Sequence, residues 1–508
     1  MKRLAVLSFL LALVPAIYIN AQKMDFKVKM LMDPAVTYDQ LLKSIGKKEL
    51  QVTSSSIEAK ELYLEAQKLI DELKLEEAIP VLGKAISLDE NFALAHLLLA
   101  KVLREIGEPD KAKLHQQKAM ELADNVSEGE SLWIRYQNAY IFGPMQDYIQ
   151  LRNKLDSTFP NDRRIQYEIG SSYYFDGEMS KAVEYLEKSV RLDPGFAPAF
   201  NVLGYAYFKQ KKDQEAEKAL KRYIELQPNS PNPYDSYAEL LLSQGKYDES
   251  IAQYQKALSI DPAFYSSLIG VGNNYIFMGE YDKARECYMK LFSNSKRRSD
   301  KYDALYNEAI SYLYEGNTEN ALKAMDRYIR LAISDSNYFE ASTAASRISF
   351  ILSETGKTDE ALKQNNVAND FLNNYQVPEA DKRLRNEWLN LDKSYIMVKK
   401  GNLKEARMQL EISEKTMADE KGGDIDKYFN TVMGMLCLNE GNYDGALKYL
   451  SGGFTTAPEN LYYTAQAYQK KGDNEKARAC LDKILNSNEN SVGLAIMRPR
   501  VKEMLSAR

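Results

Sequence analysis

The sequence predicts an all-α protein built as a solenoid of antiparallel helix pairs. Three series of residues recur at the same interval of 34 positions in this chain of 508 residues. They are a small residue, a second small residue twelve positions earlier, and a proline twelve positions later: Ala182, Ala216, Ser250 and Ala284; Gly170, Gly204, Ala238 and Gly272; and Pro194, Pro228 and Pro262. A fixed period of this length is typical of stacked helix–turn–helix units, because one such unit cannot bury its apolar face alone.

Residues 163–196 show how the first helix of one unit is specified. Ile165, Ile169 and Tyr173 lie at positions i, i+4 and i+8, so they share one face of a helix. Gly170 lies beside that face, although glycine inside a helix costs about 1 kcal/mol relative to alanine. A close approach of the neighbouring helix, against which a side chain would clash, accounts for this glycine.

A turn and a second helix complete the same unit. Gly177 is suited to a left-handed cap at the end of the first helix. Ala182 is the small residue that allows the second helix to pack tightly on the first. Pro194 ends the unit, because proline cannot continue a helix.

The turn pattern, a glycine five positions before a small residue, extends over most of the chain. Ala78 marks an early repeat in which Leu73 stands in place of the glycine. The other pairs are Gly107 with Ala112, Gly279 with Ala284, Gly316 with Ala321, Gly356 with Ala361, Gly401 with Ala406, Gly441 with Ala446, and Gly472 with Ala477. The pattern therefore predicts about twelve helix pairs, from roughly residue 57 to residue 487.

These motifs resemble the tetratricopeptide repeat family, strongly over 163–296 and more loosely elsewhere. The resemblance implies a right-handed superhelical solenoid whose first helices line a concave groove that holds extended peptides or partner termini. Carrying over the second, fifth, ninth and twelfth positions of each unit implies these peptide-binding groove residues: Arg164, Tyr167, Ser171, Tyr174, Asn201, Tyr205, Phe208, Asn232, Asp235, Glu239 and Asn273, with Ile269 and Ile276 beside them.

Two other properties of these groove positions bear on what they can bind. Tyrosine offers a large contact surface with a polar tip, and asparagine can hydrogen-bond an extended backbone through both its donor and its acceptor. The aromatic side chains could equally pack between repeats. The basic residues of the Lys/Arg carboxylate clamp, found in the chaperone-binding members of the family, are missing, which disfavours capture of a C-terminal carboxylate.

The predicted organisation has five parts. They are a signal peptide over 1–21, a partly ordered segment over 22–54, a repeat array over 55–372 with its regular core at 163–296, a looser sub-array over 373–496, and a capping helix over 497–508. Two points stay open. Residues 1–21 could be a retained transmembrane anchor, and residues 373–383 could be a long loop and not a break between sub-arrays.

Composition excludes several classes of function. The net charge is −5 at pH 7 with both signs interspersed, so no basic stripe indicates a nucleic-acid partner. The two histidines and three cysteines form no metal-binding or redox motif, so we expect neither a metal nor another cofactor. A Cys437–Cys480 disulfide stays possible, since their repeats adjoin. No nucleophile or acid–base constellation stands out, so we expect no enzyme.

The hypothesis that follows is an exported, non-catalytic scaffold in the periplasm or outside a Gram-negative cell. Its leader resembles those of exported Bacteroidetes proteins. Its partner would be a protein or extended peptide of the cell envelope, bound in the concave groove, with no integral membrane segment once the signal is cleaved. The alternative is a glycan-binding accessory protein of the envelope, in which exposed tyrosines stack on sugar rings. The scarcity of tryptophan, at two residues, argues against that alternative.

Overall fold

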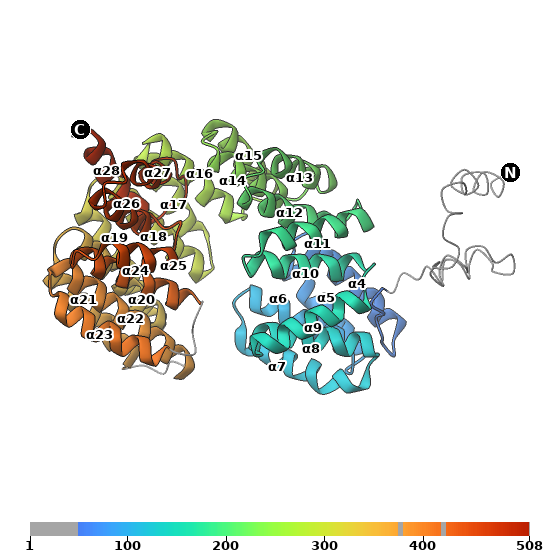
Figure 1. Cartoon of the computed structure of the whole chain (residues 1–508). Helices are drawn as coiled ribbons and strands as arrows, with labels where there is room; N and C mark the ends of the chain where they lie inside the picture. Colours follow the sequence, from blue (N-terminus) through green and yellow to red (C-terminus); the bar gives the residue numbers. More distant parts are fainter. Residues whose placement is uncertain (1–48, 374–378, 418–422, 507–508) are drawn as a thin grey trace, which may run out of the picture. The chain divides into compact units, whose positions relative to one another are not determined.

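The computed structural model describes residues 49–373, 379–417 and 423–506, and Figure 1 shows how their helices are arranged. In these ranges the regular secondary structure is helical throughout, with 25 α-helices. Consecutive helices pack as twelve hairpins, from α4 with α5 to α26 with α27, and α28 follows the last hairpin. The predicted all-α solenoid of about twelve antiparallel helix pairs is confirmed.

The chain divides into two compact units, Met1–Gln227 (unit 1) and Pro228–Arg508 (unit 2). The helices of unit 1 are α4 (Ile57–Asp71), α5 (Leu75–Leu88), α6 (Ala93–Glu105), α7 (Pro109–Leu122), α8 (Glu128–Phe142), α9 (Met145–Thr158), α10 (Arg163–Phe175), α11 (Met179–Leu192), α12 (Ala197–Lys209) and α13 (Asp213–Leu226). A short 3-10 turn, Ala123–Asn125, joins α7 to α8.

Unit 2 contains the remaining seven hairpins and the last helix. Its helices are α14 (Asn232–Ser243), α15 (Tyr247–Ile260), α16 (Tyr265–Met278), α17 (Tyr281–Asn294), α18 (Arg298–Tyr314), α19 (Thr318–Ser334), α20 (Tyr338–Glu354), α21 (Thr358–Asn373), α22 (Glu379–Lys400), α23 (Leu403–Thr416), α24 (Asp424–Asn439), α25 (Tyr443–Gly452), α26 (Pro458–Lys470), α27 (Asn474–Leu485) and α28 (Val492–Ser506).

The turn inside each hairpin depends on a left-handed residue. Gly177 has φ +80°, and its N–H donates to the carbonyl of Tyr174 at 3.1 Å, which satisfies one of the free carbonyls at the end of α10. The other predicted turn glycines also have positive φ, and at the first turn Leu73 takes the same conformation with φ 59°. The predicted turn pattern is therefore confirmed.

Lys211 occupies this left-handed position between α12 and α13 with φ 62°, and its side chain is exposed. Because a residue with a Cβ is strained there, we expect Lys211→Gly to raise the free energy of unfolding by about 0.5–1 kcal/mol. Urea denaturation would measure this gain. Lys211→Ala keeps the Cβ and should give no gain, so an equal gain from both variants would contradict the explanation by backbone strain.

The small residues inside the helices mark close helix crossings. A Cβ built on Gly170 would lie 2.7 Å from Cγ of Leu186, and one on Gly204 would lie 2.6 Å from Cγ of Leu220. Ala182 and Ala216 are completely buried on the opposing helices. The expectation that these positions are small because two helices approach closely is confirmed.

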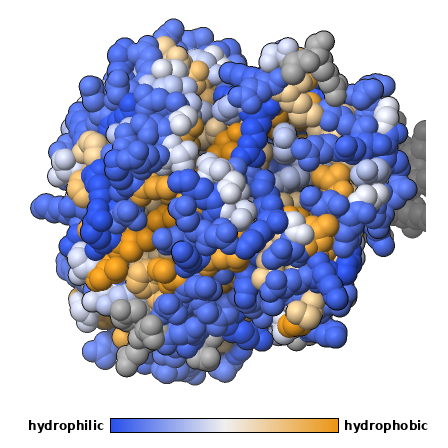
Figure 2. Space-filling model, turned by 90° about the vertical axis from the view of Figure 1, so that its left-hand side faces the viewer, coloured by the Kyte–Doolittle hydropathy of each residue, from blue (hydrophilic) through white to orange (hydrophobic). Residues whose placement is uncertain are grey.

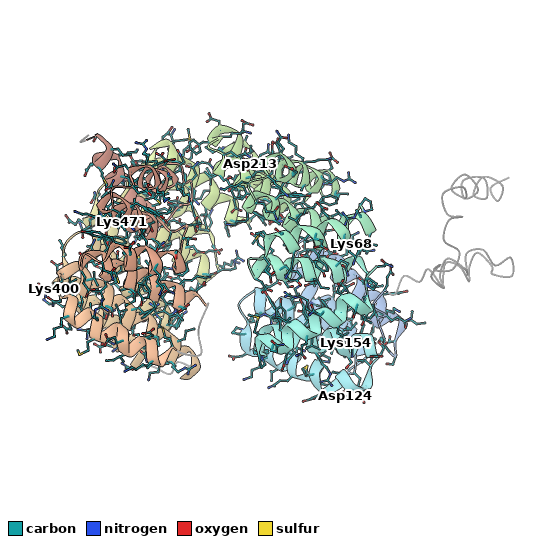
Figure 3. The ribbon with its side chains drawn as sticks, viewed as in Figure 1. Lys68, Asp124, Lys154, Asp213, Lys400 and Lys471 are labelled. Atoms are coloured by element: carbon teal, nitrogen blue, oxygen red, sulfur yellow. The ribbon has the colours of Figure 1, made fainter. Side chains whose placement is uncertain are left out.

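Charged side chains of both signs cover the outside of the helices. Figure 3 labels six of them, which lie on helices spread along the chain, and Figure 2 shows apolar patches separated by hydrophilic residues on one face. Several of the labelled residues form exposed ion pairs, such as Lys400 with Asp359 at 2.5 Å. Within the described residues, no helix is both long and apolar enough to cross a membrane.

The predicted ends of the chain need one correction. The last helix begins at Val492 and not at 497, so Pro499 lies in its interior and not in its first turn. The signal peptide predicted over 1–21 lies outside the described residues. The break predicted at 373–383 falls largely on undescribed positions and stays a prediction.

Residues 49–54, at the end of the segment predicted to be partly ordered, are held against unit 1. The N–H of Leu50 donates to Oδ2 of Asp162 at 2.7 Å. The N–H and hydroxyl of Thr53 donate to the two carboxylate oxygens of Glu130, each at 2.6 Å. Glu130 is buried at the start of α8, where it also forms a capping box with Ser127.

Candidate functional site

Unit 1 encloses a cavity of about 320 Å³, which we call the unit 1 cavity. Its walls come mainly from the first helices of five consecutive hairpins, α4, α6, α8, α10 and α12, and residues 49–52 close one side. Each of these helices follows a turn and precedes its partner, so the stacking places their inner faces side by side. The cavity is therefore built from the helices that the repeat pattern predicts to line a groove.

Three of the predicted groove residues, Arg164, Tyr167 and Asn201, line this cavity. Arg164 and Tyr167 lie three positions apart on α10, and Asn201 lies on α12. The Tyr167 ring packs edge-on against Phe196 with centroids 5.4 Å apart. Burial raises the pKa of Tyr167 to about 12, so its hydroxyl keeps its proton at neutral pH.

Ion pairs between distant helices cross the cavity wall. Arg164 donates to both carboxylate oxygens of Asp71 on α4, at 3.0 and 2.6 Å. Lys101 on α6 lies 3.2 Å from a carboxylate oxygen of Glu168 on α10. Glu168 raises the pKa of Lys101 well above its usual value, although burial opposes the ionised form. These pairs tie the first hairpins of unit 1 to the fourth.

Asn201 offers an unused hydrogen-bond acceptor to the cavity. Its side-chain oxygen is buried, and no donor reaches it among the described residues. A buried carbonyl oxygen without a donor costs about 1–3 kcal/mol. A ligand that brought an N–H group to this oxygen would remove that cost.

The other predicted groove residues of unit 1 do not line the cavity. Ser171 is buried, and Tyr174 packs edge-on against Phe175 with ring centroids 5.4 Å apart. Tyr205 and Phe208 on α12 are half-buried, and the ammonium of Lys211 lies 5.6 Å from the centre of the Phe208 ring. Of the seven groove residues predicted in unit 1, the structure brings three together around one space.

The predicted groove residues beyond residue 227 belong to unit 2. Asn232 is buried and Glu239 is exposed, both on α14. Asp235 on the same helix accepts hydrogen bonds from Ser267 at 2.6 Å and Ser266 at 3.3 Å. Burial raises the pKa of Asp235 to about 6.

Asn273, the last predicted groove residue, is covered by the chain's own C-terminal region. Its side-chain oxygen accepts from the Tyr288 hydroxyl and from the amide of Asn490, both at 2.9 Å. The same amide of Asn490 also donates to Asn307 on α18 at 3.1 Å. A partner peptide could reach Asn273 only by displacing Asn490. Of the two isoleucines beside these positions, Ile269 is half-buried and Ile276 is buried.

Sequence reasoning missed several residues that shape the unit 1 cavity. Asp71, Lys101 and Glu168 supply its charges, and Trp133 contributes an aromatic wall. The first two and Trp133 belong to repeats that depart from the regular core, where the groove positions could not be counted. Glu168 lies on α10 immediately after Tyr167, outside the four positions that the family pattern selects.

The structure adds little chemistry of other kinds. In the ranges that the structure describes, no three His, Cys, Asp or Glu side chains gather closely enough to hold a metal ion. Cys437 and Cys480 are free and buried, and Cys287 is free and half-buried. The disulfide considered between Cys437 and Cys480 is not formed. Burial raises the pKa of each of the three thiols, so they are poor nucleophiles at neutral pH.

Comparison with protein-family models places repeats along both units. Residues 163–231 and 272–336 match a model described as tetratricopeptide repeat, and residues 238–268 match one described as TPR repeat. Residues 459–491 match a further tetratricopeptide repeat model. The matches begin at the first helix of the most regular unit and reach the last hairpin.

Known proteins with similar sequences cover parts of the chain. It is 27% identical over 128 residues to Hsp70-Hsp90 organizing protein 3 of Arabidopsis thaliana, which is 25% of this chain and 23% of the relative. It is 24% identical over 342 residues to the tetratricopeptide repeat-containing protein trd-1 of Caenorhabditis elegans, which is 64% of this chain and 39% of the relative. The chain thus spans less than half the length of each of these relatives.

Among solved structures, the chain is similar to MamA, with 29% sequence identity and a TM-score of 0.28. This match covers 30% of the chain and 91% of MamA.

Proposed function

The chain is a tetratricopeptide-repeat protein, and from this premise we propose that it is a non-catalytic scaffold that binds an extended peptide or protein partner in the unit 1 cavity. The observation that carries the proposal is the unused oxygen of Asn201 inside a cavity built from five first helices. An extended peptide presents backbone N–H groups along its length, and one of them would satisfy this acceptor.

The charges and aromatic rings of the cavity support the same proposal. The Arg164–Asp71 and Lys101–Glu168 pairs place both signs of charge on the walls, so a peptide with mixed polarity finds partners there. Tyr167 and Trp133 supply apolar surface for its side chains. The name of the Hsp70-Hsp90 organizing protein describes a protein that acts on other proteins, which agrees with a scaffold role for this chain.

We further propose that the protein is exported, on the basis of the basic start and apolar run of residues 1–21. Cell fractionation followed by N-terminal sequencing would test this. A mature N-terminus close to residue 22 supports cleavage of a signal peptide. An intact Met1 on membrane-bound protein would support the anchor instead.

Asn201→Ala should weaken peptide binding by about five- to a hundredfold, because the loss of one hydrogen bond to a buried group costs about 1–3 kcal/mol. Peptides would first be selected from a random display library on the whole protein and then titrated by calorimetry. Gln214→Ala is the matched control, because Gln214 is an exposed amide on α13. Equal affinities for the wild type and Asn201→Ala across all selected peptides would overturn the assignment of the cavity.

A further inference from the structure

Unit 2 contains a cavity of its own, with a volume of about 520 Å³, which we call the unit 2 cavity. It is lined by α18, α20, α22 and α24, by residues 454–459 at the start of α26, and by residues 487–493 before and in α28. This volume lies within the range of about 300–1,000 Å³ that is usual for ligand sites. The residues that line it are all different from the predicted groove residues.

Two arginines face this cavity without a carboxylate partner. The guanidinium of Arg347 on α20 lies 4.0 Å from the centre of the Tyr306 ring, and no carboxylate lies within 4.0 Å of it among the described residues. Arg385 on α22 is equally without an ion pair there. Its one hydrogen bond reaches the carbonyl of Ser342 at 3.3 Å, and its Nε is buried without an acceptor. Both guanidinium groups therefore have unused donors.

The acidic residues of the cavity do not neutralise this pair. Asp392 already accepts hydrogen bonds from Ser346 at 2.5 Å and from Tyr428 at 2.8 Å. Burial raises the pKa of Glu459 to about 7, so this carboxyl is about half protonated at neutral pH. Glu489 is exposed at the rim. The interior is left with an excess of positive charge that a bound carboxylate would balance.

Aromatic rings complete the walls. Trp388 stacks on Tyr428 with centroids 5.2 Å apart, and Phe350 and Phe454 line the same space. No asparagine or glutamine is among the residues that line the cavity. A sugar would leave many of its hydroxyl groups without partners here, whereas an apolar side chain beside a carboxylate matches both kinds of wall.

We propose that the unit 2 cavity is a second binding site, which takes an acidic side chain of a peptide together with a neighbouring aromatic side chain. The two arginines bind the carboxylate, and the Trp388–Tyr428 stack with Phe350 receives the ring. The site is independent of the unit 1 cavity, and its test uses different variants.

The test titrates the whole protein with the peptide acetyl-Gly-Phe-Glu-Phe-Gly-amide, in which the glutamate supplies the only charge. We expect it to bind at least tenfold more tightly than the same peptide with glutamine in place of glutamate. Arg347→Met and Arg385→Met should each remove this preference. Arg330→Met is the matched control, because Arg330 is exposed on α19 of the same unit, and it should keep the preference.

Further arms separate this ligand from others. Arg347→Lys and Arg385→Lys keep the charge and should keep part of the preference, which guards against loss through misfolding alone. Asn201→Ala should leave the preference unchanged, so this result is separate from the unit 1 test. The proposal is overturned by equal affinity for the glutamine peptide or by tighter binding of a lysine peptide. Tighter binding of oligogalacturonate, or a need for a free C-terminal carboxylate, would also overturn it.

Discussion

Glu354→Gln should lower the free energy of unfolding of unit 2 by about 3–5 kcal/mol. Glu354 ends α20 with its side chain fully buried, and Lys399 on α22 lies 2.9 Å from its carboxylate. Arg500 on α28 also forms an ion pair with it. The hydroxyls of Tyr395 and Tyr463 donate to the same oxygen. A neutral amide would leave two partly buried cations without their counterion.

The pKa of Glu354 points in the same direction. Burial alone would raise it, but Lys399, Tyr395 and Arg500 together hold it below its usual value. A carboxyl whose pKa is lower in the folded state contributes stability above the unfolded pKa, and this contribution is lost as the pH falls through the folded value. The difference between the wild type and Glu354→Gln should therefore shrink at acidic pH.

Tryptophan fluorescence during urea unfolding would measure this effect. A Trp133→Phe background leaves Trp388, in unit 2, as the reporter. Asp359→Asn is the control, because Asp359 forms its ion pair with Lys400 at the exposed surface, where such a pair contributes at most about 1 kcal/mol. If Asp359→Asn and Glu354→Gln shifted the midpoint equally, the central role of Glu354 would be wrong.

Ala216→Leu should destabilise unit 1 by about 1–3 kcal/mol, whereas Ala216→Ser should change its stability little. Ala216 is completely buried on α13, and α12 approaches α13 so closely that Gly204 has no room for a Cβ. The extra carbons of leucine would push the two helices apart. Serine is accommodated at the equivalent position, where Ser250 donates to the carbonyl of Ala238 at 2.7 Å.

The readout for Ala216 is the unfolding of unit 1, followed through Trp133 in a Trp388→Phe background. Limited proteolysis should show new cleavage between residues 197 and 230 in the leucine variant alone. A leucine variant with the wild-type midpoint and no new cleavage would show that the repeat register assigned to α12 and α13 is incorrect.

The fold was predictable because its determinants are local and periodic. The glycine at the end of each first helix and the small residue in each second helix act within one hairpin, so they recur in the sequence at the period of the structure. Leu73 shows that the pattern survives the loss of one glycine, since the hairpin imposes the same backbone angle on it. The end of α28 was misjudged because Pro499 suggested a helix start, whereas the chain tolerates it inside the helix.

The sites were less predictable because they depend on contacts between distant repeats. Arg164 was placed correctly on an inner face, yet nothing in the sequence links it to Asp71, which lies 93 positions earlier. The division after Gln227 left no trace either, because Pro228 keeps the 34-residue period across it. Arg347 and Arg385 lie in the less regular repeats, where the groove positions cannot be carried over.

The asparagines of the segment before α28 restrict how this chain can change its length. Asn488 accepts from Tyr247 at 3.1 Å and donates to the carbonyl of Leu242 at 3.2 Å, while Asn490 holds Asn273 and Asn307. An open array can gain or lose a repeat at little cost, because each repeat contacts only its neighbours. Here a duplicated or deleted hairpin between α18 and α26 would carry both asparagines away from their partners. Unit 2 is thus a closed count of repeats, and its evolution proceeds by substitution within hairpins and not by duplication of them.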